Sequence, residues 1–440
     1  MARTEPARGM RDFLPEDVRR REYVIGIIKR VYEGYGFEPL ETPAAENLET
    51  LMGKYGEEGN QLIFKILKRG EHEASGQADL ALRYDLTVPL ARVMAQHAAK
   101  LPRFFKRYQI QPVWRADRPA RGRFREFYQC DVDSLGSTSP VVEAELCAAV
   151  ADVLTELGFN DFVIRINHRQ LLTAVLNAAG VPGNLHGTVL VALDKLDKIG
   201  PEGVSTDLAE RGVQGDVANG LLSFFRAGTD VNVGLHIGDD PAGIAALENL
   251  RAVLALTEGT RAAGRMRVDL TLARGLSYYT AAIMEVNVAD LAGSLGGGGR
   301  YDNLVGMFSG QDIPASGFSL GLERILVVMT ERGMFPPTLA MSPADVMVAI
   351  FDAAGAAHAM RLADSLRTHG LRVLVYPDPD KIGKQIKYAD SRGIPFVALL
   401  GADEIKEEKV TVKNLAAQTQ ETHPQAEAGA RIREALTRRG

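Results

Sequence analysis

Two neighbouring extended segments between Phe105 and Leu135 carry more charge on one face than an unaided sheet can bury. Apolar and polar residues alternate in both, which predicts two paired strands joined by a basic loop, Asp117–Gly122. The residues of one parity are Arg107, Gln109, Gln111, Arg115, Arg123, Arg125, Phe127, Gln129, Asp131 and Asp133, with Phe124 expected on the opposite face. Charged and amide groups are costly to bury without partners, so this face is either exposed to solvent or part of a site. The clustering of arginine favours a site.

A second candidate site lies between Val268 and Val286. The pattern predicts a strand that begins at Val268, a bend at Gly275 and a further strand that ends near Glu285. The residues at the bend include Arg274, Tyr278 and Tyr279. Arginine offers a donor fork suited to carboxylate or phosphate, and tyrosine offers a flat ring with a polar tip. The local pattern alone favours an ordinary hairpin with a packed tyrosine pair; a binding site is the alternative.

Asp85 and Thr87 are two residues apart in an extended segment, so their side chains point the same way. A carboxylate beside a hydroxyl suits an ammonium group. A helix cap before a predicted helix, Pro89–His97, accounts for the pair equally well.

Two glycine-rich segments follow later in the chain. Gly296–Gly299 is typical of a flexible linker, yet glycines also let a backbone lie close to a ligand. Arg324 stands near the start of a predicted helix, Ile325–Thr330, where anions are favoured. A surface arginine in a glycine-bent joint explains Arg324 equally well.

The composition of the chain limits the classes of protein to which it can belong. A chain of 440 residues predicts two or more domains, and its net charge of −5 excludes a polybasic nucleic-acid binder. Two cysteines, Cys130 and Cys147, suit a reducing compartment, and the eight histidines show no metal-ligand spacing, so we predict no protein-held metal. No apolar run approaches about 20 residues, which predicts a soluble, cytoplasmic protein with no membrane partner.

The motifs occur in an order that resembles one family. They are Gly36–Pro43, the pattern from Arg115 to Asp131, R-G-L-x-Y-Y-T at 274–280, G-G-G-R-Y-D at 297–302 and Ala315–Arg324. This set resembles motif 1, motif 2, the two histidine-specific signatures and motif 3 of histidyl-tRNA synthetases, which are class II aminoacyl-tRNA synthetases. Two positions depart from the family pattern: Ser277 stands where Asp is usual, and Asp117 where Glu is usual.

The resemblance implies an α+β fold. An antiparallel-sheet catalytic domain is expected over residues 1–335, with a helical insertion at about residues 169–263. After a proline-containing linker, an α/β anticodon-binding domain is expected over residues 343–440. Motif 1 lies at the dimer interface of relatives, which implies a homodimer. In relatives the insertion sits over the acceptor arm of tRNA; a scaffold without substrate contact is the alternative.

The resemblance also implies roles for individual residues. Arg274 and Arg115 would be the catalytic cations. The histidine-binding residues would be Asp85, Thr87, Gln129, Asp133, Tyr278 and Tyr279. ATP would be held by Arg115 at the α-phosphate, Phe127 against adenine, Arg123 at the phosphates and Arg324 at the γ-phosphate.

The implied activity is ATP-dependent ligation of L-histidine to tRNA(His) through a histidyl adenylate, with release of AMP and pyrophosphate and with Mg²⁺ as the companion of ATP. A non-catalytic paralogue that binds histidine and regulates a biosynthetic enzyme is an alternative. Such relatives generally lack the C-terminal domain and the ATP-site arginines, both of which this chain retains. An RNA-binding module without chemistry would leave the set Asp85, Thr87, Gln129 and Asp133 unexplained.

Overall fold

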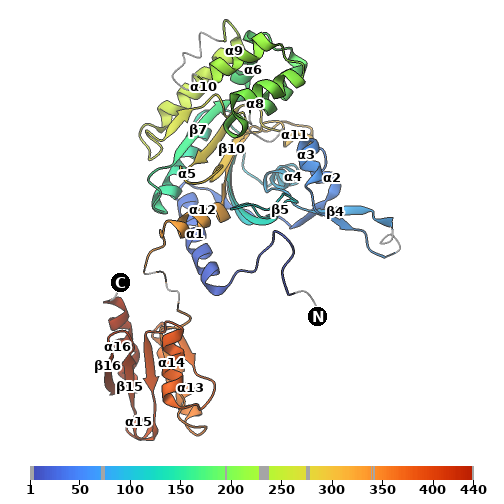
Figure 1. Cartoon of the computed structure of the whole chain (residues 1–440). Helices are drawn as coiled ribbons and strands as arrows, with labels where there is room; N and C mark the ends of the chain where they lie inside the picture. The colour runs from blue at the N-terminus through green and yellow to red at the C-terminus, as the bar shows by residue number, and fades with distance from the viewer. Residues whose placement is uncertain are drawn as a thin grey trace. The chain divides into compact units, whose positions relative to one another are not determined.

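The structure, a computed structural model, describes residues 4–70, 75–193, 196–226, 237–273, 278–337, 339 and 342–438. The chain divides into two compact units, and the main boundary falls between Met334 and Phe335 (Figure 1). Each unit has its own sheet and its own hydrophobic core. No helix among these residues is long and apolar enough to cross a membrane.

An eight-stranded sheet forms the frame of the first unit. In spatial order its strands are β1 (Glu38–Pro39), β5 (Phe105–Trp114), β6 (Glu126–Leu135), β11 (Ala315–Gly321), β10 (Gly296–Arg300), β9 (Ala282–Asn287), β7 (Val163–His168) and β8 (Met266–Val268). The six strands from β5 to β7 are antiparallel, and the two edge strands pair in parallel. The predicted α+β class and antiparallel central sheet are confirmed.

Helices cover this sheet, and a small second sheet adjoins it. The helices are α1 (Pro15–Gly34), α5 (Val141–Glu156) and α12 (Leu322–Glu331), of which α5 and α12 contact both β6 and β11. The small sheet has the order β2 (Ala45–Asn47), β4 (Ala78–Leu82) and β3 (Lys65–Leu67), and the short elements near it are α2 (Leu48–Leu51), α3 (Gly56–Gln61), α4 (Thr87–His97) and α11 (Gly306–Ser309). One apolar cluster joins this region to the large sheet, because Leu90 of α4 and Leu135 of β6 are both members.

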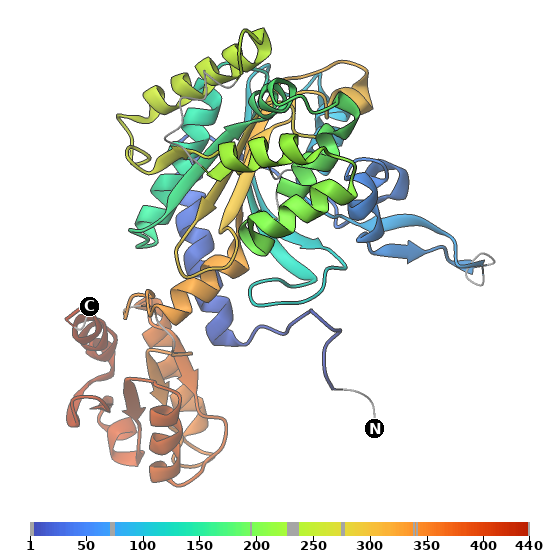
Figure 2. The same cartoon turned by 45° about the horizontal axis from the view of Figure 1, so that its top comes forward.

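The predicted helical insertion follows β7. Its elements are α6 (Arg169–Ala178), a 3₁₀ turn (Gly183–Leu185), α7 (His186–Leu193), α8 (Leu196–Glu210), α9 (Gly215–Arg226) and α10 (Pro241–Thr257). Figure 1 shows these helices at one end of the first unit, and in Figure 2, where that end is turned forward, they are seen in front of the sheet. The sequence reasoning did not identify α9, and α8 is kinked at Gly200, where φ is 70°.

The stretch from Val268 to Val286 differs from its prediction. Strand β8 ends at Val268, where a strand was expected to begin, and β7 lies between β8 and β9. The two strands therefore do not form a hairpin with each other. Asp269 explains the early end, because its carboxylate accepts hydrogen bonds from the backbone and hydroxyl of Thr271 and so forms a turn.

The second unit is a small α/β domain. Its sheet has the order β13 (Val373–Val375), β12 (Val346–Val348), β14 (Phe396–Leu399), β15 (Lys409–Asn414) and β16 (Thr419–Pro424). Its helices are α13 (Ala356–Thr368), α14 (Ile382–Ser391), α15 (Ala402–Lys406) and α16 (Gln425–Thr437). Sequence reasoning missed β16 and α15, both short and largely exposed; β16 lacks the apolar alternation that marks a half-buried strand.

Candidate active site

A single cavity of about 910 Å³ gathers most of the predicted site residues in the first unit. Among its lining residues are Asp85, Thr87, Arg115, Arg123, Phe127, Gln129, Asp133, Tyr278, Tyr279 and Arg324, together with Asp117. These residues are spread over more than 200 positions of sequence, and the antiparallel sheet brings them together. Arg274 and Ser277 lie outside the described residues.

The glycine run forms a strand of the cavity wall. Gly296, Gly297 and Gly298 line the cavity within β10, between β9 and β11. A Cβ at Gly298 would overlap the backbone oxygen of Gly317, and one at Gly299 would approach the carbonyl oxygen of Ala282 to 2.6 Å. The run is therefore no flexible linker. It is a strand, and at Gly296, Gly298 and Gly299 the neighbouring backbones lie too close for a side chain.

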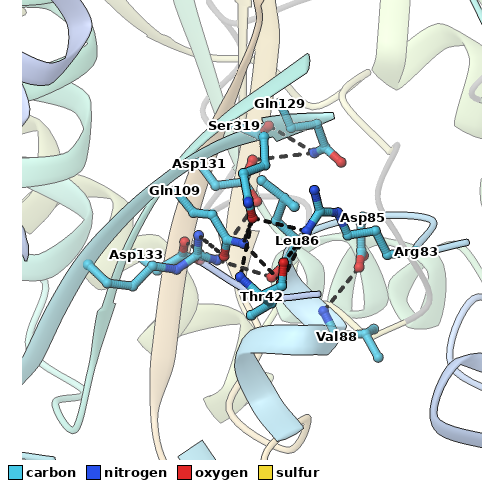
Figure 3. Close-up of polar contacts among 12 residues, drawn as sticks. Thr42, Arg83, Asp85, Leu86, Val88, Gln109, Gln129, Asp131, Asp133 and Ser319 are labelled. Carbon is cyan, nitrogen blue, oxygen red and sulfur yellow. Dashed lines mark hydrogen bonds and ion pairs between the residues drawn. The ribbon is translucent and has the colours of Figure 1, made fainter. Parts of the chain in front are cut away.

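Asp85 lines the cavity and is buried, with an exposed fraction of 1%. Its Oδ1 accepts hydrogen bonds from the Val88 backbone at 3.0 Å and from the Tyr55 hydroxyl at 3.0 Å. Its Oδ2 accepts one from the Tyr278 hydroxyl at 3.2 Å. The two interpretations of this residue are thus compatible, because Asp85 helps to cap α4 while its carboxylate faces the cavity (Figure 3). Burial raises the pKa of Asp85, against these hydrogen bonds.

A buried ion-pair cluster lies beside Asp85. Arg107 Nη2 is 2.8 Å from Asp133 Oδ2 and 3.8 Å from Asp131 Oδ2, and all three side chains are almost fully buried. The Tyr301 hydroxyl also donates to Asp133 Oδ1. Burial raises the pKa of Asp131 to about 7, an effect that Arg107 opposes and Asp133 reinforces. The pKa of Asp133 is raised for the same first reason. Two carboxylates next to one guanidinium leave a net acidic pocket.

Amide and arginine side chains hold this cluster in place. Gln129 Nε2 donates to Ser319 Oγ at 2.9 Å and lies 3.4 Å from Asp131 Oδ1. Gln109 donates to the Thr42 hydroxyl at 2.9 Å, and the buried Arg83 donates to the Thr42 carbonyl at 2.6 Å (Figure 3). The polar face predicted between Phe105 and Leu135 is thus a buried site and not a solvated surface.

Three arginines, Arg115, Arg123 and Arg324, also line the cavity. Arg115 Nε donates to the Tyr84 carbonyl at 3.0 Å, and its guanidinium lies 4.3 Å from the Tyr84 ring centroid and 5.2 Å from that of Phe127. Arg324 donates to the Ser294 carbonyl from the first turn of α12. Arg115, just after β5, and Arg324, in α12, therefore line one cavity from elements far apart in sequence.

The alternation of the second segment breaks before Glu126, where β6 begins. Phe124, expected on the opposite face, lines the cavity. Arg125, expected on the site face, is not among the lining residues; its Nε donates to the Asp117 carbonyl at 3.1 Å. The reason is that the residues just before the strand follow a turn, so period two does not apply to them.

Several lining residues escaped assignment from sequence, among them Tyr55, Asp131, Tyr301 and Glu323. Asp131 has the same parity along the strand as Gln129 and Asp133, so the alternation could have identified it as a site residue. Tyr55 and Glu323 reach the cavity only through the fold, and no local sequence pattern marks them as site residues. In the part of the chain that the structure describes, no group of three or more His, Cys, Asp and Glu side chains is arranged to hold a metal ion.

Comparison with known proteins places this geometry in a family. Residues 9–325 match the family Histidyl-tRNA synthetase, and residues 345–435 match the family Anticodon binding domain. The chain is 42% identical to a histidine–tRNA ligase of Christiangramia forsetii over 93% of this chain and 94% of that one. It is 43% identical to one of Gloeobacter violaceus, over 96% of each. A crystal structure of histidyl-tRNA synthetase from Nostoc is 30% identical, with a TM-score of 0.81 over 99% of this chain and all of that one. The chain therefore belongs to the histidyl-tRNA synthetase family.

Proposed function

We propose that the cavity has an acidic end around Asp85, Asp131 and Asp133, which holds L-histidine, and an arginine end around Arg123 and Arg324, which holds ATP. As a member of its family the chain is an enzyme that ligates L-histidine to tRNA(His) through a histidyl adenylate. The observation that supports this division of the cavity is its polarity. Three carboxylates, Asp85, Asp131 and Asp133, and three arginines, Arg115, Arg123 and Arg324, line it together. Arg115 Nη2 lies 3.4 Å from Gln129 Oε1, so Arg115 stands where the two seats would meet.

In the histidine seat, Asp85 and Thr87 receive the α-ammonium group. Asp133 and Gln129 receive the imidazole, and to this set we add Asp131, which the sequence motif left out. Imidazole presents N–H groups, and a buried carboxylate is a suitable acceptor for them. Tyr278 and Tyr279 enclose the ring: their own rings meet edge to face with centroids 5.2 Å apart. An amino acid without the N–H would leave these acceptors unpaired, which gives selectivity.

In the ATP seat, Phe127 stacks on adenine, Arg115 and Arg123 contact the phosphates, and Arg324 contacts the γ-phosphate. The histidine carboxylate oxygen attacks the α-phosphorus, the bond from that phosphorus to the bridging oxygen breaks, and pyrophosphate leaves. Fixed cations stabilise the charge that spreads over the phosphate oxygens. We assign Arg274 as a further catalytic cation at the α-phosphate, on the strength of its motif.

The second step joins the amino acid to RNA. The terminal ribose hydroxyl of tRNA attacks the carbonyl carbon of the adenylate, the bond to the phosphate oxygen breaks, and AMP leaves. Mg²⁺ enters with ATP as part of the substrate, because this ion is usually held by substrate phosphates and one or two carboxylates. When bound, it neutralises phosphate charge.

We also propose a cytoplasmic homodimer. Strand β1 (Glu38–Pro39) lies at the edge of the large sheet with both residues exposed, which suits a motif 1 interface. Both cysteines, Cys130 and Cys147, are free and buried, as suits a reducing compartment.

The test is histidine-dependent ATP–pyrophosphate exchange with two variants. Arg115→Ala should raise KM for ATP by about tenfold or more, and Asp133→Asn should raise KM for histidine by a similar factor. Arg69→Ala, an exposed arginine outside the cavity, is the matched control. Exchange by the wild type with any amino acid other than histidine would overturn the assignment of the acidic end.

A further inference from the structure

The N-terminal segment packs on the outer side of the ATP seat through alternating rings and guanidinium groups. Arg11 lies over the Phe124 ring at 3.4 Å from its centroid and over the Phe13 ring at 4.8 Å. Arg21 of α1 lies over the Phe13 ring at 4.7 Å and over the Tyr128 ring at 5.0 Å. The order Phe124, Arg11, Phe13, Arg21, Tyr128 is therefore one continuous series of cation–aromatic contacts, which we call the stack.

A backbone contact anchors the same segment. The Arg125 amide donates to the Gly9 carbonyl at 2.8 Å. Gly9 has a φ of +83°, and a Cβ there would lie 2.8 Å from Arg125 Cγ and 3.0 Å from Pro119 Cγ. The segment thus fits closely against the loop and strand start that carry Arg123 and Phe127.

Both ends of the stack reach the cavity wall. Phe124 itself lines the cavity. Tyr128, at the other end, donates its backbone N–H to both carboxylate oxygens of Glu323, at 3.0 and 3.1 Å. Glu323 is buried, lines the cavity and immediately precedes Arg324 in α12. Burial raises the pKa of Glu323 to about 7, and the charges of Arg11 and Arg21 oppose that rise. At Tyr128 the stack therefore meets the backbone contact that joins β6, with Phe127, to α12, with Arg324.

We propose that Arg11 is a positioning residue for ATP: by bridging the Phe13 and Phe124 rings, it fixes the start of β6 relative to α12. Arg11 does not line the cavity, so it acts through Phe124 and Tyr128 and not on the nucleotide itself. The inference rests on the proposed ATP seat. It assigns a role in nucleotide binding to a segment that lies about 100 residues before motif 2.

The experiment compares Arg11→Ala, Arg11→Lys and Phe124→Leu in the full chain, by exchange at varied ATP and varied histidine. Arg11→Ala and Phe124→Leu should each raise KM for ATP by about five- to tenfold and leave KM for histidine within about twofold. Arg11→Lys keeps a cation and should restore most of the ATP affinity. Arg8→Ala, which removes an exposed arginine three positions earlier, is the matched control.

A purely structural role for Arg11 would give a different pattern. Parallel increases in the two KM values, or no change in either, would overturn the proposal, as would an equal effect of Arg8→Ala. The wild type and Arg115→Ala separate this inference from the site assignment beneath it. If Arg115→Ala leaves KM for ATP unchanged, the proposed ATP seat is wrong. If Arg115→Ala raises KM for ATP but Arg11→Ala and Phe124→Leu leave it unchanged, the ATP seat stands and only the proposed role of the stack is wrong.

Discussion

Gly317 of β11 leaves no room for a side chain beside Asp133 of β6. The two residues are paired across the sheet, and a Cβ at position 317 would overlap the Asp133 Oδ1. Gly317→Ala should therefore displace the carboxylate and lower kcat/KM for histidine by about 100-fold, because misplaced site groups are costly to catalysis. Histidine-dependent exchange measures this. Gly26→Ala in α1, where a Cβ meets open space, is the control and should keep wild-type activity.

One substitution of Asp85 can separate the effect of its charge from its contribution to capping α4. Asp85→Asn keeps an oxygen that can accept from the Val88 amide but removes the negative charge. KM for histidine should rise by about tenfold or more, since hydrogen bonds to charged groups contribute about 1.5–3 kcal/mol, while the unfolding temperature stays close to wild type. Exchange kinetics and thermal unfolding measure the two effects. A fall in unfolding temperature with equal increases in both KM values would mean that Asp85 serves only the helix; Asp79→Asn, an exposed carboxylate, is the control.

The raised pKa of Asp131 predicts that the stability of the folded chain depends on pH. Burial raises its pKa from 3.8 to about 7 in the folded state, so between these values the folded chain binds a proton that the unfolded chain has released. The contribution of Asp131 to stability therefore falls as pH rises through this window, and the loss is complete above about 7. Asp131→Asn removes this effect and should raise the unfolding temperature at pH 8 more than at pH 5.

The single tryptophan provides the measurement for this variant. Trp114 ends β5 in the first unit, so its fluorescence follows the unfolding of the unit that contains Asp131. An Asp131→Asn gain that is larger at pH 5 than at pH 8 would contradict the raised pKa.

The exposed lysines of α14 give a prediction for RNA. Lys384 and Lys387 lie on α14 of the anticodon-binding domain, and Lys381 is the N-cap residue just before it. Lys384 already pairs with Asp380 at 2.8 Å. Replacing all three with Glu should weaken tRNA binding and flatten its dependence on log salt by up to about two units, because fewer counterions are released. Filter binding at several salt concentrations measures this, and exchange without tRNA should be unchanged. An unaltered salt slope would mean that the lysines are merely solvated; Lys409→Glu on β15 is the control.

Local patterns predicted the central strands and most helices, and the motifs predicted which residues meet in one cavity. They failed where distant pairing decides the outcome. Gly296–Gly299 is typical of a linker when read alone, and it becomes a strand only because β9 and β11 hydrogen-bond to it on both sides. Sequence spacing cannot show such pairing.

The same limit applies to the site. The alternation within β5 and β6 placed Arg107 and Asp133 on one face, but their direct opposition follows from the register of the two strands. That register sets Arg107 against Asp133 in a buried cluster, so the face is not a solvated surface. Tyr55 and Glu323 reach the cavity from separate elements, and nothing in their local sequence marks them.

A cavity wall of bare backbone limits how this enzyme can be changed. At Gly296, Gly298 and Gly299 of β10 a substitution cannot simply add a contact, because an added Cβ would lie within 2.6 Å of a backbone oxygen of a neighbouring strand or turn. A shift of amino-acid preference must therefore come from the side chains that surround this wall, with Asp131 and Gln129 as the first positions to vary.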